Sequence, residues 1–190
     1  MAASPTGAQR HLNRFQKLIR RFVRHRKGAT AVEFAWIAPM FFGSLFAIME
    51  TGLLFLKSNA IDAGIEEAKR VTMTGQVAGA GASNLQLQAF KDAFCAQADW
   101  IIDCANVKFD VRAFTTFAAA SMPNPIVNKQ FSDANLTFSP GNPCQIVVIR
   151  AYYETTSLSA MIRNDVSNLD NGNVVLSGSA AFKNEPYGAC

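Results

Sequence analysis

The longest apolar stretch of the chain begins at Phe34 and continues, with one interruption, to Leu56. No residue between Phe34 and Met49 is charged, and after Glu50 the apolar character resumes as TGLLFL before Lys57. As an α-helix this stretch would be about 34 Å long, enough to cross a hydrocarbon core of about 30 Å. A central charge costs about 3 kcal/mol on insertion, and the apolar residues contribute about −5 kcal/mol. The pattern therefore predicts a transmembrane helix over residues 29–56, with Glu50 near an interface or protonated.

Helical periodicity continues past the apolar stretch, over residues 57–75. The apolar positions there fall on one stripe that ends at Gly75: Ile61, Ile65, Ala68 and Val71 or Thr72. This spacing predicts that the helix extends beyond the membrane. The next residues, 76–84, include Gly79 and Gly81 but lack the preceding strand and the further motif residues of a phosphate-binding loop. They are predicted to be a flexible linker.

Residues 85–190 carry the pattern of a small α+β domain. A second helix is predicted with Ser83 or Asn84 as its N-cap and with a buried face of Leu87, Phe90 and Phe94. Three strand candidates follow in the sequence stretches NVKFDVRAF, CQIVVIRAYYET and NVVLSGSAAFK.

The three strand candidates differ in their polar pattern. The first alternates apolar residues with Lys108, Asp110 and Arg112, which is typical of a half-buried antiparallel strand. The second is more continuously apolar and is predicted to be the central strand. Residues 121–143, which are rich in Pro and Asn, are expected to form an ordered loop or a loose excursion between the first two strands.

Positive charge is concentrated at the N-terminal end. Residues 1–28 hold eight bases and no acid, which leaves the rest of the chain with ten bases and fourteen acids, a net charge of −4. The bases stop where the apolar stretch begins, a distribution that argues against a nucleic-acid-binding surface. Basic residues before a membrane helix hold that end in the cytoplasm, so the C-terminal domain is expected outside.

The basic segment 1–28 also has apolar residues at helical spacing. These positions are Leu12, Phe15, Leu18, Ile19, Phe22 and Val23. They predict an amphipathic helix on the inner leaflet, and the alternative is a leader that only sets the topology. A cleaved secretory signal is the other alternative, but LKSNA after the apolar stretch is a poor match to its cleavage site.

The stretch from Gly28 to Phe34, GATAVEF, is similar to the cleavage signature of Flp-type pilins and pseudopilins. More fully, KGATAVEFAWIAPMFFGSLFAIMETGLLFL resembles the opening of TadE-like proteins of the tight-adherence (Tad) pilus system, and FKNEPY resembles their ending. The resemblance implies that a prepilin peptidase cuts between Gly28 and Ala29. It also implies a pilin-like arrangement of one long helix on a small antiparallel sheet.

Two carboxylates in the apolar stretch are candidate subunit contacts in the membrane. The resemblance implies that Glu33 is the counter-charge of the Ala29 amine, which cleavage would create, in a neighbouring subunit offset along the axis. The alternative is that Glu33 lies at the cytoplasmic interface as a tolerated charge. Glu50 is assigned either to the outer interface or to a second subunit contact.

Four cysteines, Cys95, Cys104, Cys144 and Cys190, all fall in the part placed outside the cytoplasm, which favours disulfides over free thiols. If the second and third strands pair antiparallel, Cys144 lies near Cys190, and Cys95 and Cys104 remain as a local pair. No Cys-x2-Cys motif accompanies them, which argues against zinc.

No histidine follows residue 25, so Ser-His and Cys-His nucleophilic arrangements are not expected in the outer domain. The expectation is a non-enzymatic TadE-like minor pilin or pseudopilin without cofactor, metal, nucleic acid or small-molecule substrate. It would sit as a single-pass protein in a bacterial inner membrane, with its domain in the periplasm or incorporated in a pilus. Expected partners are the membrane, other pilins, pilus-assembly platform proteins and a prepilin peptidase. The alternatives are an uncleaved structural component of a pilus or secretion apparatus, and an envelope protein whose outer domain binds a surface or ligand.

Overall fold

The structure, a computed structural model, describes residues 28–156 and 167–190. The chain divides into two units, residues 1–45 and residues 46–190, which are described separately. The amphipathic helix predicted for the basic N-terminal segment lies outside the described residues. The described residues form an α+β fold with a long N-terminal apolar helix, further helices and a three-stranded antiparallel sheet, which confirms the predicted fold class.

The long helix, α2 (Ala29–Met73), has 45 residues and covers both the predicted membrane helix and its predicted extension. Pro39 lies inside it, and the helix continues past this residue. After Met73 the backbone reverses at Gly75, whose φ of 79° lies in the left-handed region that glycine adopts at little cost. The chain then enters the short helix α3 (Gln76–Gly79).

Unit 2 is built on a sheet with the strand order β1-β4-β5. Its strands are β1 (Val107–Phe114), β4 (Ile146–Thr156) and β5 (Asn173–Lys183). Both pairings are antiparallel, and one cross-strand row joins Phe109, Ala151 and Gly178. The most continuously apolar strand is therefore central, as predicted.

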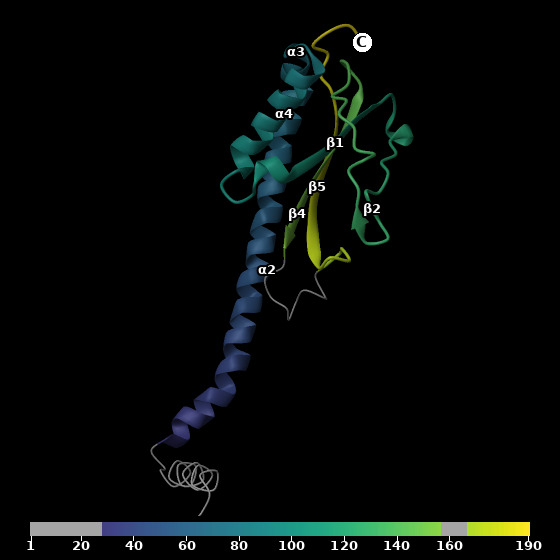
Figure 1. The fold of residues 1–190 in the computed structure, drawn as a ribbon. Coiled ribbons are helices and arrows are strands. Elements are labelled where there is room, and N and C mark those ends of the chain that lie inside the picture. Colours follow the sequence, from purple (N-terminus) through teal and green to yellow (C-terminus); the bar gives the residue numbers. More distant parts are fainter. Residues whose placement is uncertain (1–27, 157–166) are drawn as a thin grey trace, which may run out of the picture. The chain divides into compact units, whose positions relative to one another are not determined.

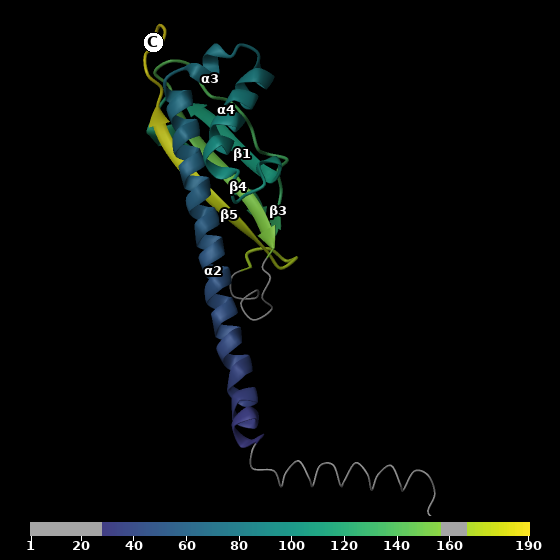
Figure 2. The ribbon, with the colours of Figure 1, turned by 90° about the vertical axis from the view of Figure 1, so that its left-hand side faces the viewer.

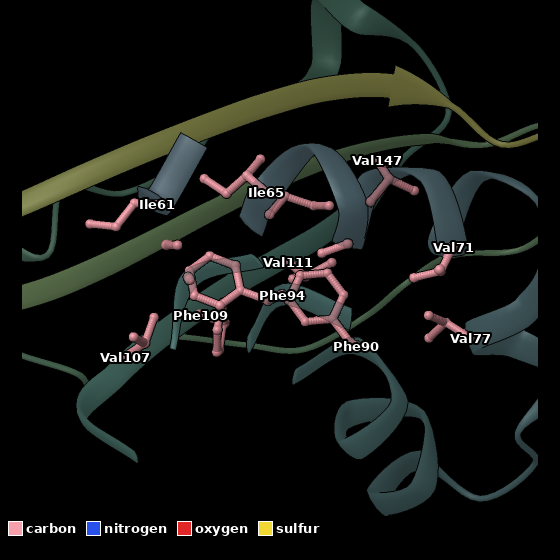
Figure 3. Close-up of a cluster of buried hydrophobic side chains, with 14 of the residues drawn as sticks. Ile61, Ile65, Val71, Val77, Phe90, Phe94, Val107, Phe109, Val111 and Val147 are labelled. Carbon is pink, nitrogen blue, oxygen red and sulfur yellow. The ribbon is translucent and has the colours of Figure 1, made fainter. Parts of the chain in front are cut away.

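The part of α2 that belongs to unit 2 packs with α4 (Ser83–Ala98) against one face of this sheet (Figures 1 and 2). Phe90 and Phe94 of α4 are fully buried and meet the ring of Phe109 edge to face, at centroid distances of 5.2 and 4.9 Å. Figure 3 shows these rings pointing into the space below Ile61 and Ile65 of α2. The predicted stripe on the second half of α2 is thus the helical side of the core.

Two glycines let these layers approach closely. A Cβ atom on Gly64 of α2 would lie 2.7 Å from the ring of Phe94 and 2.9 Å from its carbonyl oxygen. A Cβ atom on Gly178 of β5 would lie 2.6 Å from Ile65 and 2.7 Å from Asp62. All four distances are shorter than real Cβ contacts. At Gly64 one of the close atoms is backbone, so the packing of α2 on α4 depends on glycine there, whereas at Gly178 the close atoms are side-chain ends that can shift.

Two local predictions are wrong. The segment expected to be a flexible linker contains the helical turn α3, and Val77 within it is completely buried in the core. The N-cap of α4 is Ala82, which makes no side-chain cap, whereas Ser83 and Asn84 lie inside the helix. A single buried valine among glycines and alanines is too weak a periodic signal to reveal a helix of one turn.

The Pro- and Asn-rich excursion covers the other face of the sheet near its centre. It contains a small hairpin of β2 (Ile126–Val127) and β3 (Gln130–Phe131), preceded by the 3₁₀ turn η3 (Phe117–Ala119). Phe131 packs on Tyr152 of β4, with ring centroids 5.7 Å apart. The excursion is therefore an ordered layer with a second apolar cluster beneath it.

Asp110 was expected on the polar, exposed side of the first strand, and this expectation is wrong. Its side chain is completely buried, because residues 135–139 fold back over it. One carboxylate oxygen accepts hydrogen bonds from Nε of Arg112 (2.8 Å) and from the backbone N–H of Thr137 (3.1 Å). The alternation correctly assigned the strand and its face, but not the segment that covers that face.

Candidate functional site

The predicted cleavage motif lies where α2 begins. Gly28 directly precedes the helix, which starts at Ala29, and a Cβ atom on Gly28 would meet nothing within 4 Å. Packing in the described structure therefore does not require glycine there. Glu33 and Phe34 follow on the first turns, and both side chains are exposed. Backbone atoms of residues 29 and 33 lie about one helical turn apart.

Large apolar side chains are exposed on the first half of α2. Trp36 is 78% exposed and Ile37 65%. The other large apolar residues exposed on this helix are Val32, Phe34, Met40, Phe41, Phe42, Leu45, Phe46, Ile48, Met49, Leu53, Phe55 and Leu56. A soluble protein rarely exposes so much contiguous apolar surface, and such surface marks a membrane or a partner protein. Within the described residues, α2 from Thr30 onward is the one helix long and apolar enough to cross a membrane.

Side chains of α2 become buried from Glu50 onward. This carboxylate, predicted at the outer membrane interface or at a subunit contact, is only 8% exposed within this chain. One turn further along, Leu54 is buried. Lys57 donates a hydrogen bond to the hydroxyl of Thr155 on β4 (2.8 Å), and its ammonium group lies 5.7 Å from the ring centroid of Tyr153. Burial of α2 and its contacts with the sheet therefore reach further toward the apolar stretch than the sequence pattern indicated.

The C-terminal FKNEPY sequence holds the far end of α2. The side chain of Asn184 is buried and donates to the carbonyl oxygens of Pro140 (3.0 Å) and Asn142 (3.1 Å). The backbone N–H of Glu185 donates to the carbonyl oxygen of Met73, the last residue of α2 (2.9 Å). These bonds join the C-terminus, the excursion and the helix end in one place.

Tyr187 completes this contact by covering the turn after α2. A Cβ atom on Gly75 would lie 2.6 Å from Cγ of the Tyr187 ring. Burial raises the pKa of the Tyr187 phenol above its ordinary value, and the hydrogen bond from Asn184 acts in the opposite direction with a smaller effect. Two reasons require glycine at position 75: the backbone there is left-handed, and the Tyr187 ring leaves no room for a Cβ atom.

Two disulfides join Cys95 to Cys104 and Cys144 to Cys190. Their Cα atoms are 6.0 and 5.7 Å apart, within the usual range. These are the two pairs predicted from the strand order. The first ties the end of α4 to the start of β1, and the second ties the start of β4 to the C-terminus.

Residues 28–70 match the family model described as TadE-like protein. The match confirms the predicted resemblance over the cleavage motif and most of α2, and it begins at Gly28. No curated protein and no solved structure matches the chain. The TadE-like segment therefore covers the apolar half of α2 and most of its buried stripe, whereas the sheet lies outside the match.

Sequence reasoning missed the contacts of Lys57 with β4 and the burial of Glu50. The sequence signal for them is the position of Lys57, two helical turns after Glu50 and directly before the buried stripe. The described residues hold no group of three or more His, Cys, Asp or Glu side chains placed to bind a metal ion. The features that point to function are an apolar surface, a peptide motif and a buried helix stripe.

Proposed function

We propose that this chain is a single-pass membrane component of a Tad-type pilus that is processed by a prepilin peptidase and acts by assembling with other pilin-like subunits. The observation that carries the proposal is the coincidence of three starting points. The TadE-like match begins at Gly28, α2 begins at Ala29, and the exposed apolar surface begins at Val32. A cut after Gly28 would remove the basic leader and leave an apolar helix with a free amine at its first residue.

The burial of Glu50 favours a shorter membrane segment than the apolar stretch itself. Residues 29–49 form a helix of about 31 Å, which matches a hydrocarbon core of about 30 Å. On this placement Glu50 and Lys57 belong to the outer domain, so neither charge has to enter the lipid. The energetic objection that Glu50 raises against insertion then disappears.

Glu33 is the remaining charge inside the proposed segment. A carboxylate within a bilayer is stabilised only by a partner, and the amine at Ala29 of a cleaved neighbouring subunit offers one. Such a pair would form only on assembly, and it would fix how far two helices are offset along their axes. The free energy of this ion pair would therefore fix the register between subunits and would not assist membrane insertion.

Intact-mass measurement on protein from cells with and without the cognate peptidase tests the processing step. The expected result is loss of residues 1–28 only where the peptidase is present. Gly28→Leu is expected to block this cut, because a bulky residue replaces a small one at the site. Gly52→Leu serves as the control, because a Cβ atom there also meets nothing within 4 Å. Full-length chain in both strains would favour the uncleaved anchor instead.

Glu33→Gln separates assembly from anchoring. The change is nearly isosteric and removes a charge, so membrane insertion and cleavage should persist while incorporation into the pilus is lost. Glu66→Gln, an exposed carboxylate on the same helix outside the membrane segment, is the matched control and should assemble normally. Normal piliation by cleaved Glu33→Gln protein would return Glu33 to a tolerated interfacial charge.

A further inference from the structure

β5 forms one edge of the sheet, and part of its backbone points away from its neighbour β4. The side chain of Asn168 accepts from the N–H of Val175 (2.8 Å) and donates to its carbonyl oxygen (3.0 Å), so these groups face the outer edge. At the other end, the N–H of Asn184 donates to Gln145, which precedes β4, and the N–H of Glu185 points to Met73. Backbone direction alternates along a strand, so the odd-numbered residues between these points face the edge.

This alternation leaves Ser177, Ser179 and Ala181 with outward-facing N–H and C=O groups. No backbone hydrogen bond from elsewhere in the described ranges reaches them. Their side chains are small and exposed, and residues 174–182 contain no charge and no proline. The devices that usually protect an edge strand from pairing are therefore missing along most of β5.

The opposite edge of the sheet is bridged at Val111 of β1 by residues 137–139. The N–H of Val111 on β1 donates to the carbonyl oxygen of Thr137 (2.7 Å), and its own carbonyl accepts from the N–H of Ser139 (2.8 Å). Among residues 28–156 and 167–190 the two edges therefore differ, and β5 is the one that offers unpaired backbone groups to an added strand.

The direction of β5 restricts what can pair with it. Asn173, where β5 begins, pairs with Thr156, next to the residue that binds Lys57; its far end leads to Glu185, which binds Met73. β5 thus runs in the same direction as α2. Antiparallel pairing of two β5 strands would orient two α2 helices oppositely, which copies inserted the same way in one membrane cannot do. A co-oriented neighbour must present a different surface, in a heterologous contact.

Such a surface follows the opposite edge strand, β1, in residues 115–121. This segment follows β1 and is exposed, and Phe117 within it is 62% exposed. No residue from 113 to 128 is charged. Phe114 shares a cross-strand row with Ile146 and Lys183, so the segment begins level with the far end of β5. Its backbone is extended at Thr116 and Ala120, on either side of the η3 turn.

We propose that residues 115–121 of one copy of this chain dock against the open β5 edge of the next copy, side by side and in the same orientation. The docked segment opens the short η3 turn, and its backbone pairs with the edge-facing groups of Ser177, Ser179 and Ala181. Residues 115–121 and 174–182 hold no charged side chain of their own, so pairing them buries no charge from either segment. The inference rests on the membrane insertion proposed above, because insertion is what makes the copies co-oriented.

Site-specific photo-crosslinking tests this contact in the full-length chain in its membrane. With p-benzoylphenylalanine at Ser179, irradiation should yield a dimer whose crosslinked peptides join β5 to residues 115–121. The same probe at Gln88, an exposed position on α4, is the control and should give no such product. Adding Phe117→Asp should lower the yield at Ser179 several-fold. A crosslink joining β5 to β5, products with other proteins or lipid alone, or no product would each overturn the inference.

Membrane retention is measured in the same samples. A chain found in the soluble fraction would contradict both the proposed function and this inference. A membrane-inserted chain that gives no crosslink to residues 115–121 would contradict the inference alone.

Discussion

Ile37 and Ile65 lie on the same helix in opposite surroundings. The first is 65% exposed, whereas the second is 2% exposed and packs against the sheet. Around Ile37 the helix is apolar on every side; around Ile65 it has one apolar stripe, with Asp62, Glu66 and Lys69 on the other faces. An all-apolar helix requires an apolar solvent, whereas a striped helix requires one apolar neighbour and water elsewhere. One continuous helix can therefore serve lipid and protein because its pattern changes along its length.

The largest difference is expected between alanine replacements of these two isoleucines. Ile65→Ala leaves a cavity between α2 and the sheet and should lower the free energy of unfolding of the outer domain by about 2–5 kcal/mol. Ile37→Ala removes the same atoms from an exposed position and should leave that free energy nearly unchanged. Denaturant unfolding of the full chain in detergent, followed by near-ultraviolet circular dichroism, measures both. Equal losses would contradict the division of α2.

Two glycines on α2 provide a second matched pair. Gly64→Ala places a methyl group against the ring and the carbonyl of Phe94, and overpacking of this kind costs about 1–3 kcal/mol. Gly52→Ala meets nothing within 4 Å and should be neutral or slightly stabilising, because alanine favours helix. The comparison is made by the same unfolding measurement. A neutral Gly64→Ala variant would mean that α2 and α4 are further apart than described.

A smaller effect is expected at Lys57, whose side chain contacts β4. Lys57→Met keeps the apolar stem but loses the hydrogen bond to Thr155 and the contact with the Tyr153 ring, at a cost of about 1 kcal/mol. Lys69→Met, which breaks an ion pair with the exposed Glu66, should cost less. The two midpoints of denaturant unfolding decide this. A larger loss of stability in Lys69→Met than in Lys57→Met would contradict the stabilising role of the Lys57 contacts.

The smallest expected effect is the pH dependence from Tyr187. Burial raises the pKa of this phenol in the folded state, so its contribution to stability is fully present below the unfolded pKa of about 10. The contribution is lost as pH rises from there through the folded pKa. Above a pH of about 10, the free energy of unfolding should therefore fall more steeply with pH for the wild type than for Tyr187→Phe. If the two proteins lose stability in parallel with pH, Tyr187 is not buried against the turn after α2.

The sequence predicted the elements that have a strong period. The stripe from Ile61 to Thr72, the central position of β4 and both cysteine pairs follow from spacing and strand order alone, and the structure has all of them. In long amphipathic or alternating segments the sequence pattern itself shows which face must be buried.

The features that could not be predicted depend on segments far apart in the chain or on elements too short to show a period. Asp110 is buried because residues 135–139 cover it, and the β2–β3 hairpin has strands too short to show alternation. At the candidate site the motif at Gly28 was readable, but the burial of Glu50 was not. A lone carboxylate in an apolar stretch looks the same in sequence whether a membrane interface or its own domain surrounds it.

The central claim is that α2 leaves lipid at about Glu50 and is surrounded by water and its own domain beyond it. Single cysteines at Phe42 and Asn59 test it most directly, because both side chains are exposed on the helix in the structure. Spheroplasts are treated with a membrane-impermeant maleimide, with the wild type, whose cysteines are in disulfides, as background. The account predicts labelling at residue 59 and labelling at residue 42 only after the membrane is dissolved. Equal labelling of both in intact spheroplasts, or protection of residue 59, would contradict it.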